Sequence, residues 1–260
     1  MKYEWVIGKY SRQDFAISGK CIRCAQFPFT CQLFKKSRDG PTYQLRTFVI
    51  SESEAVLRYF QPGRKAAGDG FNLLDVNACF VPDKMGKSNG LQIMLPTSEH
   101  SVRCLFVYSD SCEDVVNFFQ ALRCSKFHLL QSAYPEVAHE GLIDQLTTSF
   151  VREGWMKKSS AKLQAVRDSF RKRWFTLHQR YLYYFDGPLS PLPKGRIFIG
   201  HRDMGYSVHK GFLTPQSKLT STGGLGFTVV TPSKDHVLLV DSEAECLRWT
   251  EAIQSVVPTK

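Results

Sequence analysis

The chain has 260 residues, a length typical of two domains that each bury a core, and its 43% hydrophobic and 22% charged residues exclude a disordered protein. Its formal net charge of +10 favours anionic partners, namely nucleic acid, a lipid surface or phosphorylated ligands. No apolar run approaches the roughly 18 residues of a membrane-spanning helix, and the N-terminus lacks the apolar core of a signal peptide, so we expect a soluble cytoplasmic protein.

Two short motifs suggest chemistry that their surroundings do not support. Cys21 and Cys24 have the spacing of half a zinc site, but no second Cys or His pair follows at a suitable distance, so we expect no metal and no cofactor. Residues 85–89 contain the Gly-Lys-Ser end of a phosphate loop, yet Val81 stands where that motif needs its first glycine. The segment therefore predicts a turn between two strands.

The eight cysteines are scattered through apparent strands and helices, which is typical of buried thiols.

The chain repeats one pattern twice. Residues 45–60 and 172–185 each contain an Arg before a strand, a short polar turn and a second strand that ends in Tyr-Phe, which predicts two β-hairpins of one design. Later strands correspond as well, residues 89–95 to residues 225–231 and residues 102–109 to residues 235–242. The offsets are 127, 125 and 131 residues for Arg46 and Arg173, Tyr59 and Tyr184, and Phe118 and Trp249. So small a drift indicates one domain that has been duplicated.

Each half ends in a segment with helical periodicity. The first, residues 112–131, has acidic residues in its first turn and places Val115, Phe119 and Leu122 on one side. The second begins at Ser242, a predicted N-cap, and its apolar stripe is expected to hold Leu247, Trp249, Ile253 and Val256. Short strands in hairpins followed by one amphipathic helix predict a small β-sandwich or partly open barrel that the helix plugs.

Particular residues carry a resemblance to a known family. The stretches "EGWMKKS" (153–159), "FRKRWFTL" (170–177) and "YLYYF" (181–185), with Trp249 in the closing helix, resemble a pleckstrin homology (PH) domain, and the first half shows the same plan. Residues 2–15 resemble the last helix of the zinc-finger catalytic domain of GTPase-activating proteins (GAPs) for ADP-ribosylation factor (Arf), and residues 127–136 resemble the inter-domain segment of the dual-PH branch, the alpha-centaurins.

The resemblance implies a mainly β fold with C-terminal helices: two tandem PH domains, each a seven-stranded sandwich or partly open barrel capped by one α-helix. We expect a tail that is the remnant of the last Arf-GAP helix at 1–26, the first PH domain at 27–131, a helical linker at 132–150 and the second PH domain at 151–257. No residues match the family's four-cysteine zinc finger or its arginine, so we expect no enzymatic activity.

The resemblance also implies a head-group site in the second half. Alternate residues of a strand share a face, so Arg171 and Arg173 project together while Lys172 points the other way. The family's ligand motif is a Lys that ends the first strand, a loop, and then a basic residue, any residue and Arg. The matching positions, together with a Tyr whose hydroxyl reaches a phosphate and a basic residue before the fourth strand, are Lys158, Arg171, Arg173, Tyr184 and Lys194.

The first half matches the motif less completely. Lys35, Arg46 and Tyr59 occupy comparable places, but Gln44 stands where the first basic residue is expected, and residues 66–72 supply no match for Lys194. We expect a weaker or less selective site there. Phe118 replaces the usual helix Trp, a change that keeps the packing and loses the indole N–H.

The predicted function is recruitment to anionic phosphoinositide membranes, chiefly the plasma membrane, through phosphatidylinositol 3,4,5-trisphosphate or its soluble head group, inositol 1,3,4,5-tetrakisphosphate. Ten basic residues stand against three acidic ones between Arg152 and Lys194, which accounts for most of the net charge. Alternatives are a PH-fold interaction scaffold whose charges form a solvated face, or a single-strand nucleic-acid binder, because basic strands interleaved with aromatics also describe such platforms. We expect lipid, with Arf-family or other proteins as further partners, and no nucleic acid.

Overall fold

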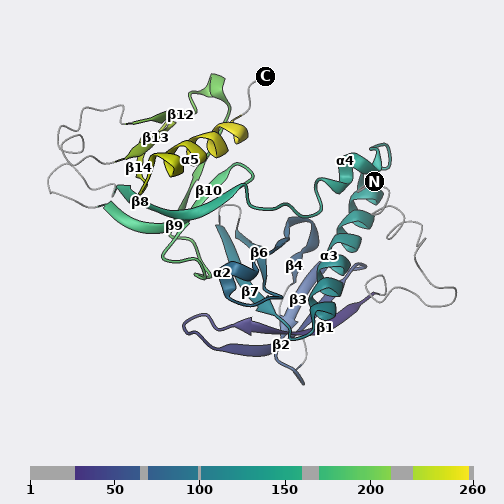
Figure 1. Cartoon of the computed structure of the whole chain (residues 1–260). Helices are drawn as coiled ribbons and strands as arrows, with labels where there is room; N and C mark the ends of the chain where they lie inside the picture. The colour runs from purple at the N-terminus through teal and green to yellow at the C-terminus, as the bar shows by residue number, and fades with distance from the viewer. Residues whose placement is uncertain (1–26, 65–69, 99–100, 160–169, 212–224, 258–260) are drawn as a thin grey trace. The chain divides into compact units, whose positions relative to one another are not determined.

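The computed structural model describes residues 27–64, 70–98, 101–159, 170–211 and 225–257 (Figure 1). The chain divides into two compact units, Met1–Ser149 and Phe150–Lys260. The expected tail at 1–26, with Cys21 and Cys24, lies outside the described residues. None of the described helices is both long and apolar enough to cross a membrane.

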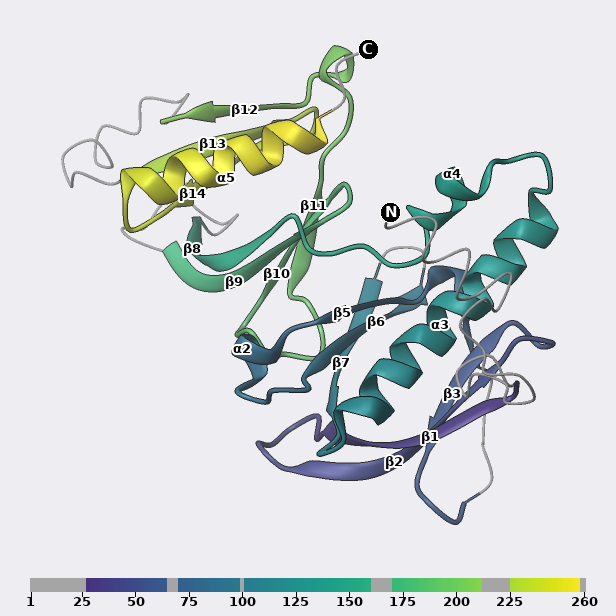
Figure 2. The ribbon, with the colours of Figure 1, turned by 45° about the vertical axis from the view of Figure 1, so that its right-hand side comes forward.

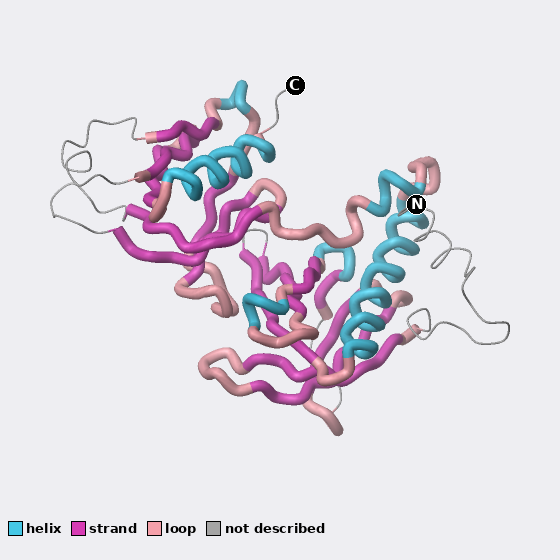
Figure 3. The backbone as a smooth tube through the Cα atoms, in the orientation of Figure 1, coloured by secondary structure: helices cyan, strands magenta, loops and turns pink. Residues whose placement is uncertain are grey.

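The first unit contains one antiparallel sheet of seven strands in the order β4-β3-β2-β1-β7-β6-β5 (Figures 1 and 3). Its elements are β1 (Phe29–Lys36), β2 (Tyr43–Ser51), β3 (Val56–Phe60), β4 (Phe71–Asn72), η2 (Leu73–Asp75), β5 (Asn77–Phe80), α2 (Pro82–Met85), β6 (Leu91–Ser98), β7 (Ser101–Tyr108), α3 (Cys112–Ala133) and α4 (His139–Ile143).

The second unit repeats this topology, because its sheet has the order β11-β10-β9-β8-β14-β13-β12. Its elements are β8 (Arg152–Ser159), β9 (Phe170–His178), β10 (Tyr181–Phe185), β11 (Gly195–Phe198), η3 (Arg202–Met204), β12 (Ser207–Lys210), β13 (Gly226–Thr231), β14 (Lys234–Leu239) and α5 (Glu243–Val256). Both predicted hairpins are confirmed as β2–β3 and β9–β10. In the described residues the two edge strands of each sheet do not pair with each other, so neither sheet forms a closed barrel.

One helix fills the core of each unit. Figure 2 shows α3 and α5 each crossing the sheet of their own unit, and they pack on β1 and β2 and on β12 and β13 respectively. Phe118 of α3 is fully buried with its ring centroid 5.5 Å from that of Phe48. Trp249 of α5 is fully buried as well, and it lies against Gly154, where an added Cβ would be only 3.5 Å from the indole.

The predicted apolar stripe of the last helix is partly wrong. Ser242 caps α5, since its Oγ accepts from the backbone N–H of Glu245 at 3.1 Å, and Trp249 and Ile253 are buried. Leu247, however, is 40% exposed. Each residue of an α-helix turns by about 100°, so Leu247 lies nearly opposite Trp249 on the helix circumference. Cys246 takes the buried position in its place.

The segment after α3 packs into the first unit. Leu142, Ile143 and Leu146 belong to its buried core. Asn77 fixes the chain just beyond them, because its side-chain amide donates to the carbonyl of Thr148 at 3.0 Å and its Oδ1 accepts from the backbone N–H of Thr148 at 2.9 Å.

The Gly-Lys-Ser segment is not a phosphate loop. It follows the one-turn helix α2 and leads into β6, so the strand-to-strand connection is confirmed. Gly86 ends α2 in the left-handed region, at φ 61°, which favours glycine. Of the cysteines in the described ranges, five are buried thiols and Cys112 is exposed.

Lys126 is a cation inside the first unit. Its side chain is 4% exposed, and its Nζ donates to the carbonyl of Val76 at 2.9 Å. Burial lowers the pKa of Lys126 to about 8, an effect that nearby Asp75 partly opposes. Between about pH 8 and pH 10.5 the unfolded chain therefore binds a proton that the folded chain has lost.

We expect Lys126→Met to remove a rise in stability with pH. Below about pH 8 the wild type carries the full cost of a buried ammonium, and its unfolding free energy should rise by up to about 3 kcal/mol relative to the variant as pH approaches 10.5. Urea denaturation followed by circular dichroism at several pH values checks this, with exposed Arg64→Met as the control for loss of one charge. Parallel pH profiles for wild type and Lys126→Met would contradict it.

Candidate functional site

The β8–β9 ladder determines which side chains share a face at the open end of the second unit. Lys158 lies opposite Arg171, and Met156 lies opposite Arg173. Directly opposite residues of an antiparallel pair project from the same face. Met156 is a buried core residue, so this face of the hairpin is the one that points into the core. Lys158, Arg171 and Arg173 project from the same face, just beyond the end of the core. The predicted alternation of Arg171 and Arg173 against Lys172 is what the strand shows.

Two of the cations share one carboxylate. Arg173 Nη1 lies 2.7 Å from Asp186 Oδ1, and Lys194 Nζ lies 2.9 Å from Asp186 Oδ2. The Arg173 side chain is only 21% exposed, whereas those of Asp186 and Lys194 are at least half exposed. Arg173 on β9 and Lys194, the residue before β11, therefore lie close enough to bind one anion together.

Tyr184 joins the same group from β10. The ammonium of Lys158 lies 5.2 Å from the centroid of the Tyr184 ring. Tyr184 pairs with Gly195 across the sheet, and a Cβ added to Gly195 would overlap the Tyr184 hydroxyl and ring. The glycine thus leaves the space in which the phenol lies. The five predicted residues are therefore neighbours, and we call them the second basic cluster: Lys158, Arg171, Arg173, Tyr184 and Lys194.

Three further residues act on this cluster and are absent from the sequence prediction. Asp186 is one of them. Burial lowers the pKa of Lys158, and the charge of Lys234 on β14 lowers it further. Burial, Lys158 and Lys234 together lower the pKa of His236 to about 4, so this imidazole is neutral at pH 7. The 131-residue offset of the repeat aligns Lys234 with Arg103, but no sequence pattern places either residue beside a cluster.

The first unit has the same frame. Lys35 lies opposite Gln44, and Leu33 lies opposite Arg46, as Lys158 and Met156 do for Arg171 and Arg173. Lys35 Nζ lies 5.7 Å from the centroid of the Tyr59 ring. Burial lowers the pKa of Lys35, and Arg103 and Arg46 lower it further. We call these residues the first basic cluster: Lys35, Arg46, Tyr59 and Arg103.

The first basic cluster differs in how its arginine is held. Arg46 donates to Gln44 Oε1 at 2.5 Å and to the carbonyl of Leu45 at 2.8 Å, so two of its donors bond within the strand that carries it. By the 125-residue offset of Tyr59, Gln61 takes the place of Asp186. The segment expected to lack a match for Lys194 lies partly outside the described residues.

A family model described as PH domain matches residues 150–258. The human protein called Arf-GAP with dual PH domain-containing protein 2 is 32% identical over 262 residues, which cover 99% of this chain and 66% of the human protein. The rat protein of the same name is also 32% identical, over 99% of this chain and 67% of its own length. The chain belongs to the Arf-GAP family with dual PH domains. It spans about two thirds of the length of these relatives.

Solved PH domains are similar to part of the chain. The C-terminal PH domain of pleckstrin, crystallised with D-myo-Ins(1,2,3,4,5)P5, is 20% identical to this chain, with a TM-score of 0.32, over 42% of this chain and 100% of that domain. The two units are the two PH domains of the family, and the resemblance inferred from the sequence is confirmed. The domain boundaries and the head-group residues remain predictions.

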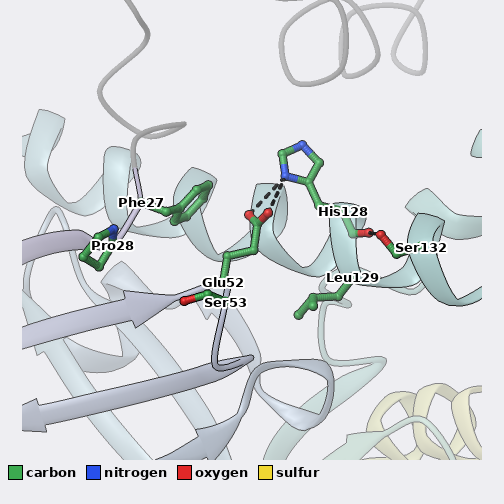
Figure 4. Close-up of a pocket in the computed structure, with 7 residues that line it drawn as sticks. All are labelled: Phe27, Pro28, Glu52, Ser53, His128, Leu129 and Ser132. Carbon is green, nitrogen blue, oxygen red and sulfur yellow. Dashed lines mark hydrogen bonds and ion pairs between the residues drawn. The ribbon is translucent and has the colours of Figure 1, made fainter.

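A separate pocket of about 380 Å³ lies in the first PH domain (Figure 4). Figure 4 shows the Glu52 carboxylate directed at the His128 ring, whose Nδ1 lies 3.0 Å away. Cys124 Sγ lies 3.7 Å from Nε2 of the same ring. This row of thiol, imidazole and carboxylate has the order of a hydrolase triad, but Cys124 is fully buried and a nucleophile must be accessible. In the described ranges no three His, Cys, Asp or Glu side chains are placed to hold a metal.

We expect Gly195→Ala to destabilise the second PH domain by about 1–3 kcal/mol, because the added methyl group forces the Tyr184 ring to move. Urea denaturation followed by Trp fluorescence measures this, since Trp155, Trp174 and Trp249 lie in that domain. Gly187→Ala is the matched control, because its added Cβ would lie 3.8 Å from its nearest neighbour. Equal stability of the two variants would show that Tyr184 does not depend on Gly195.

Proposed function

We propose that the chain binds phosphoinositides and moves to membranes that contain them, chiefly the plasma membrane, with the second PH domain leading. The ligand is the head group of phosphatidylinositol 3,4,5-trisphosphate, or inositol 1,3,4,5-tetrakisphosphate when it is free. The convergence of the second basic cluster from β8, β9, β10 and the residue before β11 carries this proposal.

The chemistry of the cluster suits phosphate. The planar guanidinium of an Arg can hold a phosphate through two N–H donors, and Lys adds a mobile charge at the rim. The lowered pKa of Lys158 means that the folded protein disfavours its charged form. A polyanion bound beside Lys158 and Lys234 would relieve both the like-charge repulsion and part of the cost of burial. Relief of this repulsion therefore adds to the free energy of ligand binding.

The first PH domain supports a weaker site. Its cluster lacks a cation at Gln44, and Arg46 already bonds to that side chain. Arg103 adds a positive charge from the last strand, as Lys234 does in the second domain. A weak first site would still increase the time that the chain spends on a bilayer if both domains bind the same membrane.

The family name makes Arf GTPases candidate protein partners, and we propose that the chain itself does not accelerate GTP hydrolysis. A nucleic-acid platform is less well supported, since base stacking requires exposed ring faces. Phe175, Tyr183 and Phe185 of the basic aromatic hairpin are buried, and the ring of Trp155 beside it on β8 is exposed, at 39%.

Calorimetric titration with inositol 1,3,4,5-tetrakisphosphate tests the proposal. We expect saturable binding that Arg173→Ala weakens by about ten- to a hundredfold, because a charge-assisted hydrogen bond contributes roughly 1.5–3 kcal/mol. Arg46→Ala should have a smaller effect. Arg180→Ala is the matched control, since Arg180 is an exposed Arg in the turn at the other end of the same hairpin.

A single-stranded oligonucleotide is titrated in parallel. Heat from the oligonucleotide without heat from the head group would assign the charge to nucleic acid. No saturable binding of either ligand would support the solvated-face alternative. Clear acceleration of GTP hydrolysis by Arf in the presence of the chain would contradict its proposed lack of GAP activity.

We expect Asp186→Asn to tighten head-group binding by about three- to tenfold. The Asp186 carboxylate occupies donors of Arg173 and Lys194 and adds a negative charge beside the ligand, and exposed pairs of this kind contribute up to about 1 kcal/mol each. The same titration measures the change, with the 70% exposed Asp203 as the control in Asp203→Asn. Weaker binding by Asp186→Asn would show instead that the carboxylate orients Arg173 for the ligand.

A further inference from the structure

The strand β11 forms one edge of the second sheet, and among the described residues it pairs with β10 alone. The backbone N–H of Ile199, just after β11, donates to the carbonyl of Arg180 at 2.8 Å. Hydrogen bonding alternates along an antiparallel pair, so Ile197 also bonds to β10, while the backbone N–H and C=O groups of Arg196 and Phe198 point away from it. The edge therefore offers the donors and acceptors to which a further strand can pair.

A row of aromatic rings lies beside this edge. Tyr181 lies opposite Phe198 in the β10–β11 ladder, with ring centroids 5.3 Å apart, and the Tyr206 ring meets Phe198 edge to face at 5.7 Å. The guanidinium of Arg196 lies 4.4 Å from the centroid of the Tyr181 ring. The side of this row that faces solvent is apolar, since Phe198 is 42% exposed. We call these four residues the edge patch: Tyr181, Arg196, Phe198 and Tyr206.

The edge patch is held in place by the fold. A Cβ added to Gly200 would overlap the Tyr206 ring, so this ring lies directly on the backbone of the glycine. The contacts among the rings and with Arg196 fix the other members. Tyr, Phe and Arg are enriched in the buried centres of protein interfaces, and side chains that are already ordered lose little entropy when a partner binds.

The corresponding edge of the first domain is blunted. Its strand β4 has two residues, and the Asn72 side chain accepts from the backbone N–H of Leu74 at 3.0 Å, which turns the chain into η2. Edge strands are commonly protected by such short length or by a charge that points outward. In β11 the strand has four residues, its one charged side chain, Arg196, lies over the Tyr181 ring, and Phe198 is exposed.

Charge and geometry decide which occupant fits. Lipid and nucleic acid have no backbone that could pair with the alternating donors and acceptors of a strand edge, whereas an extended peptide has one. A second copy of β11 paired with the first would bring the cations of both copies together. Three cations stand against one acid between residues 194 and 206, namely Lys194, Arg196 and Arg202 against Asp203. The complementary peptide is therefore acidic.

We infer that the β11 edge is a docking site for an acidic segment of a protein partner, which binds in extended form as an additional strand of the second sheet. The backbone of the segment pairs with Arg196 and Phe198, its apolar side chains pack on Phe198 and Tyr206, and its carboxylates meet Arg196. The edge patch contains no residue of the second basic cluster, so the inference does not depend on the proposed function.

Binding of a synthetic peptide to the full chain tests this inference. The probe is a fluorescein-labelled peptide of alternating glutamate and valine, and binding is followed by fluorescence anisotropy. We expect saturable binding that Phe198→Ser weakens about tenfold or more, because truncation of a central aromatic residue has large effects in interfaces. Leu247→Ser is the matched control, since Leu247 is 40% exposed on α5 of the same domain.

Two measurements on the wild-type chain test the pairing itself. The same peptide with N-methyl groups on three successive central residues keeps its charge but cannot pair through either edge, so we expect it to bind at least about tenfold more weakly. In hydrogen exchange, the amides of Arg196 and Phe198 should exchange more slowly when the unmodified peptide is bound. The amides of β12, at the other edge of the sheet, should not change.

Each result supports or overturns the inference. No saturable binding by wild type, equal losses in Phe198→Ser and Leu247→Ser, or equal binding of the N-methylated peptide would overturn it. A dimer in sedimentation that Phe198→Ser dissociates would assign the edge to a second copy instead, and binding of phosphatidylserine vesicles that requires Phe198 would assign it to lipid.

Titration with inositol 1,3,4,5-tetrakisphosphate separates this site from the head-group site. We expect Phe198→Ser to bind the soluble head group within about twofold of wild type, since the edge patch and the second basic cluster share no residue. An equal loss of head-group and peptide binding would contradict a separate site. If wild type binds the peptide but not the head group, the docking site stands and the proposed function fails.

Discussion

The register of the β8–β9 ladder is the constraint on which the whole site depends. With Lys158 opposite Arg171 and Met156 opposite Arg173, the hairpin inserts its apolar residues into the core and directs its inner cations beyond the end of that core. A slip of one residue would exchange the two faces of β9. Arg171 and Arg173 would then point outward, and Trp174 would replace Phe175 in the core. The core packing that fixes the fold thus also fixes where the charge lies.

The concentration of charge at this place has a cost that the rest of the domain reduces. Lys158 is partly buried beside Lys234, and burial together with the charges of both lysines lowers the pKa of His236 to about 4. Asp186 offsets part of the remaining charge by bridging Arg173 and Lys194. The cluster therefore contains its own small anion, and under the proposed function a phosphate would replace or join an interaction for which the donors are already arranged.

Most of the fold could be predicted from the sequence, because hairpins, caps and core helices are encoded locally. Alternation along β9 identified the inner face, and the repeat predicted the matching topology of the two domains. Contacts between distant elements were not available from such patterns: Lys234 joins the site from β14, 63 residues beyond Arg171. Asp186 follows β10 directly, yet only the folded sheet brings it to Arg173. The prediction that Leu247 is buried was wrong because apolar character alone does not determine which side of a helix faces the core.

The two domains show how a duplicated frame can diverge in chemistry while its packing is kept. Lys35 and Tyr59 reproduce the contact of Lys158 and Tyr184, and Phe118 fills the place of Trp249 in the core. The differences fall at the rim, where Gln44 replaces Arg171 and Gln61 replaces Asp186. Each of these changes removes a charge without removing a core contact. Exposed charged side chains contribute little to folding stability but much to the electrostatic field that a polyanion meets. The two domains can therefore differ in affinity and selectivity for a polyanion at little cost to the stability of either.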